Sequence, residues 1–430
     1  MKNFALKNEK FQIKINCFII LFIIFSFPIA NLLQNFVILY NLNEIVFFGK
    51  YFKFLYEYIF IFIRLVIIGI FTLIIIFYDQ NFNKYIFSLL ILNLLFFSNL
   101  FFSDPIIFNS DFFKYFREQY SETKYQINPN SFFLDENKII LISFFNIIFP
   151  LIALSFKEFK FKENLMIKYY ENIYKFYIII IILLTLKITY FISLTKDHIE
   201  NFFYWNIFFK NYLTNYHQEL MPISLYLVII FYKKIFNEET LIKKDIIFIS
   251  ISIFLLITFK SYLNIGCALV LASIIAFYKL NLLNFKSYKI KISLFNYIFF
   301  LIIFSFVLIL MIIIEKNGFG FVTSVSYRWT IYNFYFENFQ NINLFFGNSL
   351  IKSKIWVSPH NFVIDILYFS GILGLIFFIF LFYKFLKNQN LFHFISFYFL
   401  ISSLFSGFFF LNTAFMILFA ISLNVSKEKL

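Results

Sequence analysis

The chain has 430 residues, of which 61% are apolar and only 14% are charged, and its formal net charge is +14. So little charge cannot cover the surface of a water-soluble protein of this size, which excludes a cytosolic globular protein. A nucleic-acid binder is excluded as well, because the lysines fall in short clusters between apolar runs of membrane-spanning length. We therefore expect an all-α polytopic membrane protein, with residues 1–430 forming a single integral-membrane domain.

The apolar runs follow one another along the whole chain. Crossing the hydrocarbon core takes about 20 apolar residues, so the shorter runs need flanking aromatic residues or a tilt. The first run is too long for the core of a signal peptide, and no small-residue cleavage site follows it, so we expect a retained helix. The sequence predicts about twelve transmembrane helices, at 16–40, 57–78, 85–102, 138–155, 176–193, 219–232, 245–259, 262–278, 294–314, 361–383, 391–405 and 408–423.

The distribution of Lys and Arg predicts how the expected spans are oriented in the membrane. With the amino terminus inside, the inner segments hold 22 cations and the outer segments hold 11, although the outer segments are longer. The density differs about threefold in the sense of the positive-inside rule. We therefore predict that both termini are cytoplasmic. Cys17 and Cys267 both fall in apolar runs, so neither a disulfide framework nor a metal knuckle is expected.

Three of the expected outer loops are long, at 103–137, 194–218 and 315–359. Loops of this length are uncommon unless they carry function or fold on the membrane surface. In the last one, aromatic residues recur at helical spacing, which predicts an amphipathic helix at the interface. The alternative is a helix that only caps the bundle. The aromatic residues are Trp329, Tyr332, Phe336 and Phe339.

Arginine is rare in this chain, which has Arg64, Arg117 and Arg328 against 34 lysines. An arginine retained in so lysine-rich a sequence is a candidate for binding phosphate through its bidentate fork. Arg328 lies in an outer loop at the start of the amphipathic helix, where helix amides add anion-binding donors. A snorkelling interfacial arginine is the alternative. A solvated face explains Arg117, and an intramembrane pair or snorkelling explains Arg64.

Two further residues on the outer side are candidates for chemistry. His360 lies in Ser358-Pro359-His360-Asn361, directly before the run at 361–383, and imidazole can act as a base near neutral pH. A polar anchor for the helix end is the alternative. Lys260 lies at the tight outer turn between the seventh and eighth runs, where snorkelling is the alternative. His393 is interpreted as an interfacial residue without a partner.

Signatures of soluble enzymes are absent from the sequence, including the phosphate-binding Gly loop, Gly-x-Ser-x-Gly, His-Glu-x-x-His and Asp-x-Asp. The stretch at 320–380 instead resembles the signature region of the O-antigen ligase and O-antigen polymerase superfamily of bacterial inner-membrane glycosyltransferases. Four elements carry the resemblance in the family's order. They are Ser326-Tyr327-Arg328-Trp329, Leu344-Phe345-Phe346-Gly347, His360-Asn361 and Gly371-Ile372-Leu373-Gly374.

The resemblance implies an inverting transfer of a glycan from undecaprenyl diphosphate to an acceptor hydroxyl at the periplasmic face of the bacterial inner membrane. The partners implied are this lipid-linked glycan, an acceptor glycolipid or glycan and membrane lipids, with neither a metal nor another cofactor. His360 and Arg328 would be catalytic, and Arg328 and Lys260 would bind the diphosphate. The supporting residues would be Tyr327, Trp329 and Asn361.

Some features depart from the family pattern. Phe259-Lys260-Ser261 stands where the family often has Ser-Arg-Gly, so that Lys260 would replace an arginine as the second cation. The loop between Arg328 and His360 is short for a ligase, and Asn412 is the polar group nearest to the place of an acidic residue sometimes seen in the family. A ligase and a polymerase of lipid-linked polysaccharide therefore both remain open. A flippase or transporter of lipid-linked sugars, which usually shows internal repeats, and a membrane scaffold are the alternatives from other classes.

Overall fold

A computed structural model describes residues 2–39, 62–63, 65–70, 84–97, 148, 151, 161–194, 216–236, 242–259, 261–284, 344–347, 361–386, 391–403 and 413–424. Within these residues the structure is all-helical apart from short turns, which confirms the expected fold class. The helices are α1 (Lys2–Leu39), α3 (Lys84–Phe97), α6 (Glu163–Leu194), α8 (Tyr216–Phe236), α9 (Lys243–Thr258), α10 (Tyr262–Asn284), α13 (Phe362–Leu386), α14 (Leu391–Ser403) and α15 (Thr413–Asn424).

Each of these helices coincides with an apolar run of the sequence. Three of them contain stretches long and apolar enough to cross a membrane, at Phe11–Ala30, Glu163–Leu186 and Val363–Tyr383. Shorter apolar helical stretches lie at Leu263–Ile275, Leu391–Ser402 and Ala414–Leu423. The runs at 294–314 and most of those at 57–78 and 138–155 lie outside the described residues.

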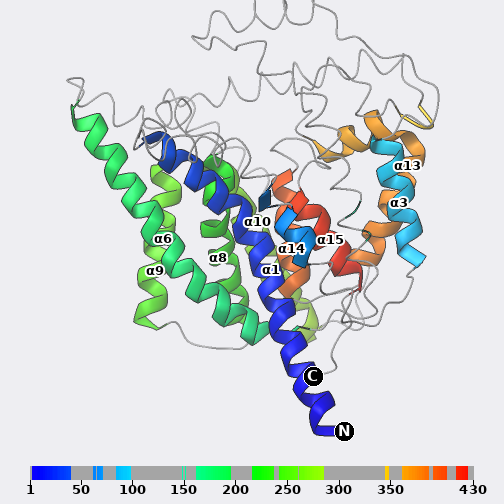
Figure 1. The fold of residues 1–430 in the computed structure, drawn as a ribbon, viewed down its shortest axis with the longest axis horizontal. Helices are drawn as coiled ribbons and strands as arrows, with labels where there is room; N and C mark the ends of the chain where they lie inside the picture. The colour runs from blue at the N-terminus through cyan, green and yellow to red at the C-terminus, as the bar shows by residue number, and fades with distance from the viewer. Residues whose placement is uncertain are drawn as a thin grey trace, which may run out of the picture.

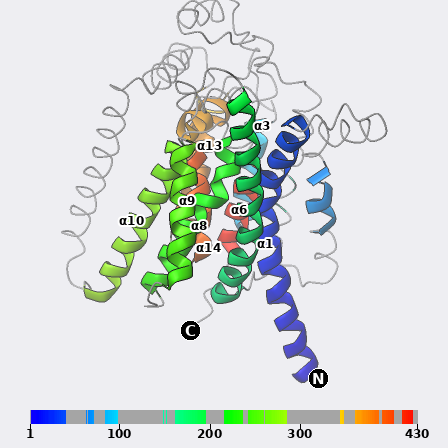
Figure 2. The ribbon, with the colours of Figure 1, turned by 90° about the vertical axis from the view of Figure 1, so that its left-hand side faces the viewer.

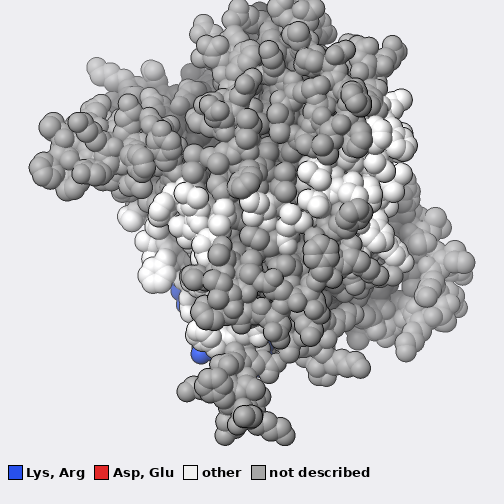
Figure 3. Space-filling model, turned by 45° about the vertical axis from the view of Figure 1, so that its right-hand side comes forward, with Lys and Arg blue, Asp and Glu red and all other residues white. Residues whose placement is uncertain are grey.

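One end of the bundle is rich in lysine. At this end, which we call the basic end, α6, α9 and α14 begin and α8 finishes with Lys233 and Lys234 in its last turn. The start of α6 joins its neighbours there, since Glu163 accepts hydrogen bonds from the Tyr232 hydroxyl and from the backbone N–H of Leu391. The basic end lies at the bottom of Figure 1 and of Figure 2, which shows α6, α8 and α9 from the side. On the face drawn in Figure 3, the described surface is mostly uncharged, and lysine atoms show only toward its lower part.

Tyrosines hold α6 against its neighbours. Tyr170, Tyr174 and Tyr177 recur every three or four residues and so share one face of the helix, and all three are almost fully buried. Tyr170 donates a hydrogen bond to the carbonyl of Pro222 (2.7 Å), and Tyr177 donates to the carbonyl of Glu219. A buried hydroxyl is costly without a partner, and these hydroxyls find theirs on the backbone of α8.

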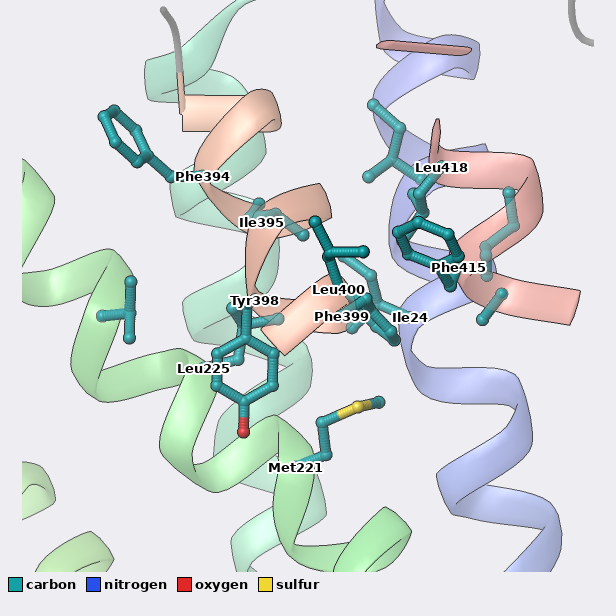
Figure 4. Close-up of a cluster of buried hydrophobic side chains, with 14 of the residues drawn as sticks. Ile24, Met221, Leu225, Phe394, Ile395, Tyr398, Phe399, Leu400, Phe415 and Leu418 are labelled. Atoms are coloured by element: carbon teal, nitrogen blue, oxygen red, sulfur yellow. The ribbon is translucent and has the colours of Figure 1, made fainter. Parts of the chain in front are cut away.

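Helix α14 occupies the centre of the bundle. Its Tyr398, Phe399 and Leu400 are almost fully buried, and Figure 4 shows them among side chains of α1, α8 and α15, including Ile24, Leu225 and Phe415. Neighbouring helices thus cover the apolar side chains of this short helix on several sides. Cys17 and Cys267 are buried free thiols.

Helix α13 is broken in its middle. Gly371 has φ 67° and ψ −170°, a conformation that almost only glycine adopts, and it divides the helix into two halves. In Figure 1 the first half lies across the upper end of the bundle, and the second half descends beside α3, with which it packs extensively. The predicted span at 361–383 thus corresponds to an apolar helix of spanning length, but the sequence did not predict its break at Gly371.

Candidate functional site

Most of the predicted site lies outside the described residues. This applies to Arg328, Tyr327, Trp329, His360 and Lys260, and to the amphipathic helix that begins near Arg328. The structure does describe Asn361, the turn at Leu344–Gly347, the whole of α13 and the residues on either side of position 260. These segments belong to the end of the bundle opposite the basic end, or to the helices that begin there.

Asn361 is the N-cap of α13. Its side-chain oxygen accepts hydrogen bonds from the backbone N–H groups of Val363 (2.9 Å) and Ile364 (3.4 Å). Its own carbonyl accepts the first intrahelical bond, from the N–H of Asp365 (2.9 Å). Asparagine is among the best N-caps, because its oxygen satisfies amides that have no partner inside the helix. Asn361 was predicted to be a supporting residue. In the structure it stabilises the first turn of α13, the helix that follows position 360 in the sequence.

Two of the four family-like elements are in direct contact. The backbone N–H of Ile372 donates to the carbonyl of Leu344 (2.9 Å), and that of Leu373 donates to the carbonyl of Phe345 (3.1 Å). These amides lie at the break in α13, where they have no carbonyl partner in their own half-helix. The turn at Leu344–Gly347 therefore caps the second half of α13.

Both ends of this contact require glycine. A Cβ at Gly371 would overlap the carbonyl of Phe345, and a Cβ at Gly347 would overlap the backbone of Phe369. Both glycines also have positive φ, of 67° at Gly371 and 78° at Gly347. One close approach of two backbone segments thus explains why each of two separate motifs contains a glycine. We call this contact between the turn and α13 the Gly347–Gly371 junction.

The first half of α13 buries an acidic residue. Asp365 is fully buried and lies in the first helical turn, where the helix dipole stabilises a negative charge. A second acid, Glu219, is 3% exposed in the first turn of α8. Neither residue was among the candidates predicted from the sequence. The signal was present, because an acidic residue within an apolar run is a candidate for function by default.

A chain of hydrogen bonds lies next to position 260. The Tyr398 hydroxyl donates to Asn264 Oδ1 (2.9 Å) and also shares a hydrogen bond with the Ser224 hydroxyl, while Asn264 Nδ2 donates to Ser261 Oγ (2.8 Å). All four residues are buried. Figure 4 shows the Tyr398 hydroxyl pointing toward α8. This chain ties α8, α10 and α14 together at the residue that directly follows Lys260.

His393 differs from its sequence-based interpretation. It is 4% exposed, and its Nε2 lies 3.1 Å from the carbonyl of Ser422 in α15. It therefore joins α14 to α15, and the expectation of a histidine without a partner is wrong. In the part of the chain that the structure describes, no group of three His, Cys, Asp or Glu residues is placed to hold a metal ion.

Comparisons of the chain with protein-family models, with curated proteins and with solved structures found no match.

Proposed function

We propose that the protein is a membrane glycosyltransferase that resembles O-antigen ligases and moves a glycan from undecaprenyl diphosphate to an acceptor hydroxyl. The Gly347–Gly371 junction carries the proposal. It joins the turn at Leu344–Gly347 to the middle of α13 by two backbone hydrogen bonds, and this close approach of the two backbones requires Gly347 and Gly371. We infer that the segment before this turn, with Arg328, folds back toward the helix that follows His360.

The chemistry requires few groups. The acceptor hydroxyl oxygen attacks the anomeric carbon, the bond from this carbon to the diphosphate oxygen breaks, and the diphosphate leaves with the bonding electrons. His360 accepts the hydroxyl proton. Arg328, with its bidentate fork, and Lys260 stabilise the charge that develops on the departing diphosphate. A single displacement of this kind inverts the configuration at the anomeric carbon.

Described polar groups fix the helix starts that directly follow two of these residues in the sequence. Asn361 fixes the start of the helix after His360, and the hydrogen bonds of Ser261 and Asn264 fix the start of the helix after Lys260. Asp365 places a buried carboxylate in the same helical turn as this cap. We infer that its charge supports the start of the helix that follows His360.

The proposal includes about twelve transmembrane helices, cytoplasmic termini and a periplasmic loop at 315–359, in the inner membrane of a bacterium. Cysteine-accessibility labelling at Asn341 tests the orientation. We expect an impermeant thiol reagent to label an Asn341→Cys variant from the periplasmic side. Labelling that requires permeabilised inner membranes would contradict the orientation and the proposed function.

A ligase and a polymerase of lipid-linked polysaccharide differ only in the acceptor, and both fit these residues. A flippase, the alternative from another class, commonly binds anionic substrate at the amides of a broken helix. The amides of Ile372 and Leu373 at the break in α13 are already bonded to carbonyls, which argues for a structural role of this break.

The activity is tested with the purified protein, an undecaprenyl diphosphate-linked oligosaccharide and a glycolipid or glycan acceptor. We expect Arg328→Lys to reduce transfer about a hundredfold, because losing a contact to a developing charge costs on the order of 3 kcal/mol. Arg117→Lys is the matched control and should keep wild-type activity. Equal activity of Arg328→Lys and Arg117→Lys would show that Arg328 only anchors the loop.

A further inference from the structure

A small hollow opens at the basic end between α6, α8 and α9. Its floor is aromatic, because the rings of Tyr174 and Tyr226 stack 3.9 Å apart at an interplanar angle of 7°, and Phe248 meets both of them edge-on. Its rim is charged and includes Lys175 and Glu171 of α6 and Lys244 of α9. None of these groups has a part in the glycan transfer proposed above.

The charges around the hollow do not cancel. Glu171 forms an ion pair with Lys233 (3.1 Å), and Asp245 forms one with Lys234 (2.7 Å). Both carboxylates are thus already neutralised by lysines of α8.

Lys175 and Lys244 are the two lysines that line the hollow. Each acts on the other electrostatically as a like charge, and Glu171, which is already paired with Lys233, also attracts Lys175. Within the described residues neither lysine forms an ion pair with a carboxylate at salt-bridge distance. Lys175 donates a hydrogen bond to the neutral side chain of Asn172 (3.0 Å). The start of α9 adds the positive end of its helix dipole beside Lys244. Two neighbouring ammonium groups repel each other, and an anion between them would turn the repulsion into attraction.

An exposed apolar surface begins at the same two lysines. On α6, Lys175 is followed by Phe176 (72% exposed), Ile179 (52%) and Leu183 (54%), which lie on one face of the helix. On α9, Lys244 is followed by the exposed side chains of Ile246 and Ile247. In a membrane protein such a surface contacts the acyl chains of lipids. The two lysines lie at the end of this surface, which is where the headgroup of such a lipid would lie.

We propose that the pair Lys175 and Lys244 binds the phosphate of an anionic phospholipid, whose acyl chains lie along the exposed apolar side chains of α6 and α9. The phosphate supplies negatively charged acceptor oxygens for both ammonium groups. Zwitterionic lipids carry their own ammonium group, which weakens the attraction. The proposal rests on insertion of the bundle in a membrane and is independent of the glycan transfer.

The experiment compares lipid retention by the purified full-length protein in mixed detergent micelles that contain equal amounts of phosphatidylglycerol and phosphatidylethanolamine, measured by native mass spectrometry. We expect the wild-type protein to retain phosphatidylglycerol preferentially. The variant Lys175→Gln/Lys244→Gln should retain about 25-fold less, because each lysine near an anionic lipid contributes roughly a fivefold increase in affinity.

The matched control is Lys168→Gln/Lys243→Gln. It removes the same two charges from the same two helices, but its residues do not line the hollow. We expect it to retain phosphatidylglycerol like the wild-type protein, and Lys175→Arg/Lys244→Arg should do so as well. Equal losses in the two Gln variants, or equal retention of the two lipids by the wild-type protein, would overturn the proposal. Protection against heat by inorganic phosphate as strong as that by phosphatidylglycerol would assign the pair to free phosphate and overturn its assignment to lipid.

Discussion

The Gly347–Gly371 junction makes a sharp prediction about stability. Replacing Gly371 by Ala forces a residue with a Cβ into a backbone region that costs about 1–3 kcal/mol, and the Cβ would overlap the carbonyl of Phe345. If the turn at Leu344–Gly347 moves away from α13 to relieve this overlap, the two hydrogen bonds that its carbonyls accept from α13 are lost as well. Each loss costs about 1 kcal/mol. We therefore expect a total loss of about 4 kcal/mol. At roughly 2 °C per kcal/mol for a chain of this length, the apparent Tm falls by about 8 °C.

The assay is thermal denaturation in detergent, followed by size-exclusion chromatography. Gly266→Ala in α10 is the matched control, because nothing lies within 4 Å of an added Cβ there and its φ is not positive. It should leave the Tm unchanged or raise it, since Ala favours a helix over Gly by about 1 kcal/mol.

The combined variant Gly347→Ala/Gly371→Ala separates this contact from general damage. Because both substitutions break the same contact, the double variant should melt close to the Gly371→Ala variant, without the sum of the two losses. Fully additive losses, or a Gly371→Ala variant that melts together with Gly266→Ala, would refute the argument that the junction holds the two motifs together.

Three further substitutions test the candidate site. Asn361→Ala removes the N-cap of α13 and should lower stability by about 1 kcal/mol in thermal denaturation, whereas Asn361→Ser should keep both stability and glycan transfer; loss of transfer with Ser would assign a direct role to the amide. Tyr398→Phe removes the hydroxyl that links Ser224 and Asn264 and should cost about 2 kcal/mol, measured as a lower Tm; an unchanged Tm would show that this chain of hydrogen bonds does not stabilise the bundle. Asp365→Asn keeps the size of the side chain but removes its charge, so we expect transfer to fall at least about tenfold while the protein still elutes as a single species. Wild-type transfer by Asp365→Asn would limit this buried acid to a structural role.

The positions of the helices were predictable because the length of an apolar run depends on local composition alone. The run at 391–405 corresponds to α14 and that at 219–232 to α8. Where bounds differ, the cause is chemical. Helix α6 begins at Glu163, well before the predicted run at 176–193, because Lys168, Glu171 and Lys175 interrupt the apolar pattern without interrupting the helix. The length of an apolar run gives only the part of a helix that fits in lipid. A helix with charged residues in its first turns extends beyond that part.

The break in α13 was not predictable in the same way. The sequence shows two glycines in Gly371-Ile372-Leu373-Gly374, and glycine also occurs inside continuous helices, as Gly266 does in α10. What makes Gly371 a break is the turn at Leu344–Gly347, whose carbonyls replace the lost helical hydrogen bonds. A helix interrupted at membrane depth needs such partners, because lipid offers none. The conformation of Gly371 therefore depends on a segment more than twenty positions away in the sequence.

The same reasoning explains why Asn361 was assigned only a supporting role and Asp365 none. The motif His360-Asn361 draws attention to side chains that can act on a substrate. In the structure, the Asn361 oxygen is already engaged by the N–H groups of Val363 and Ile364. An N-cap and a buried acid in the first turn both make the start of a helix rigid and polar inside an apolar bundle. In the proposed transfer His360 is the base, and a rigid turn directly after it would help to keep it at hydrogen-bond distance from the acceptor hydroxyl.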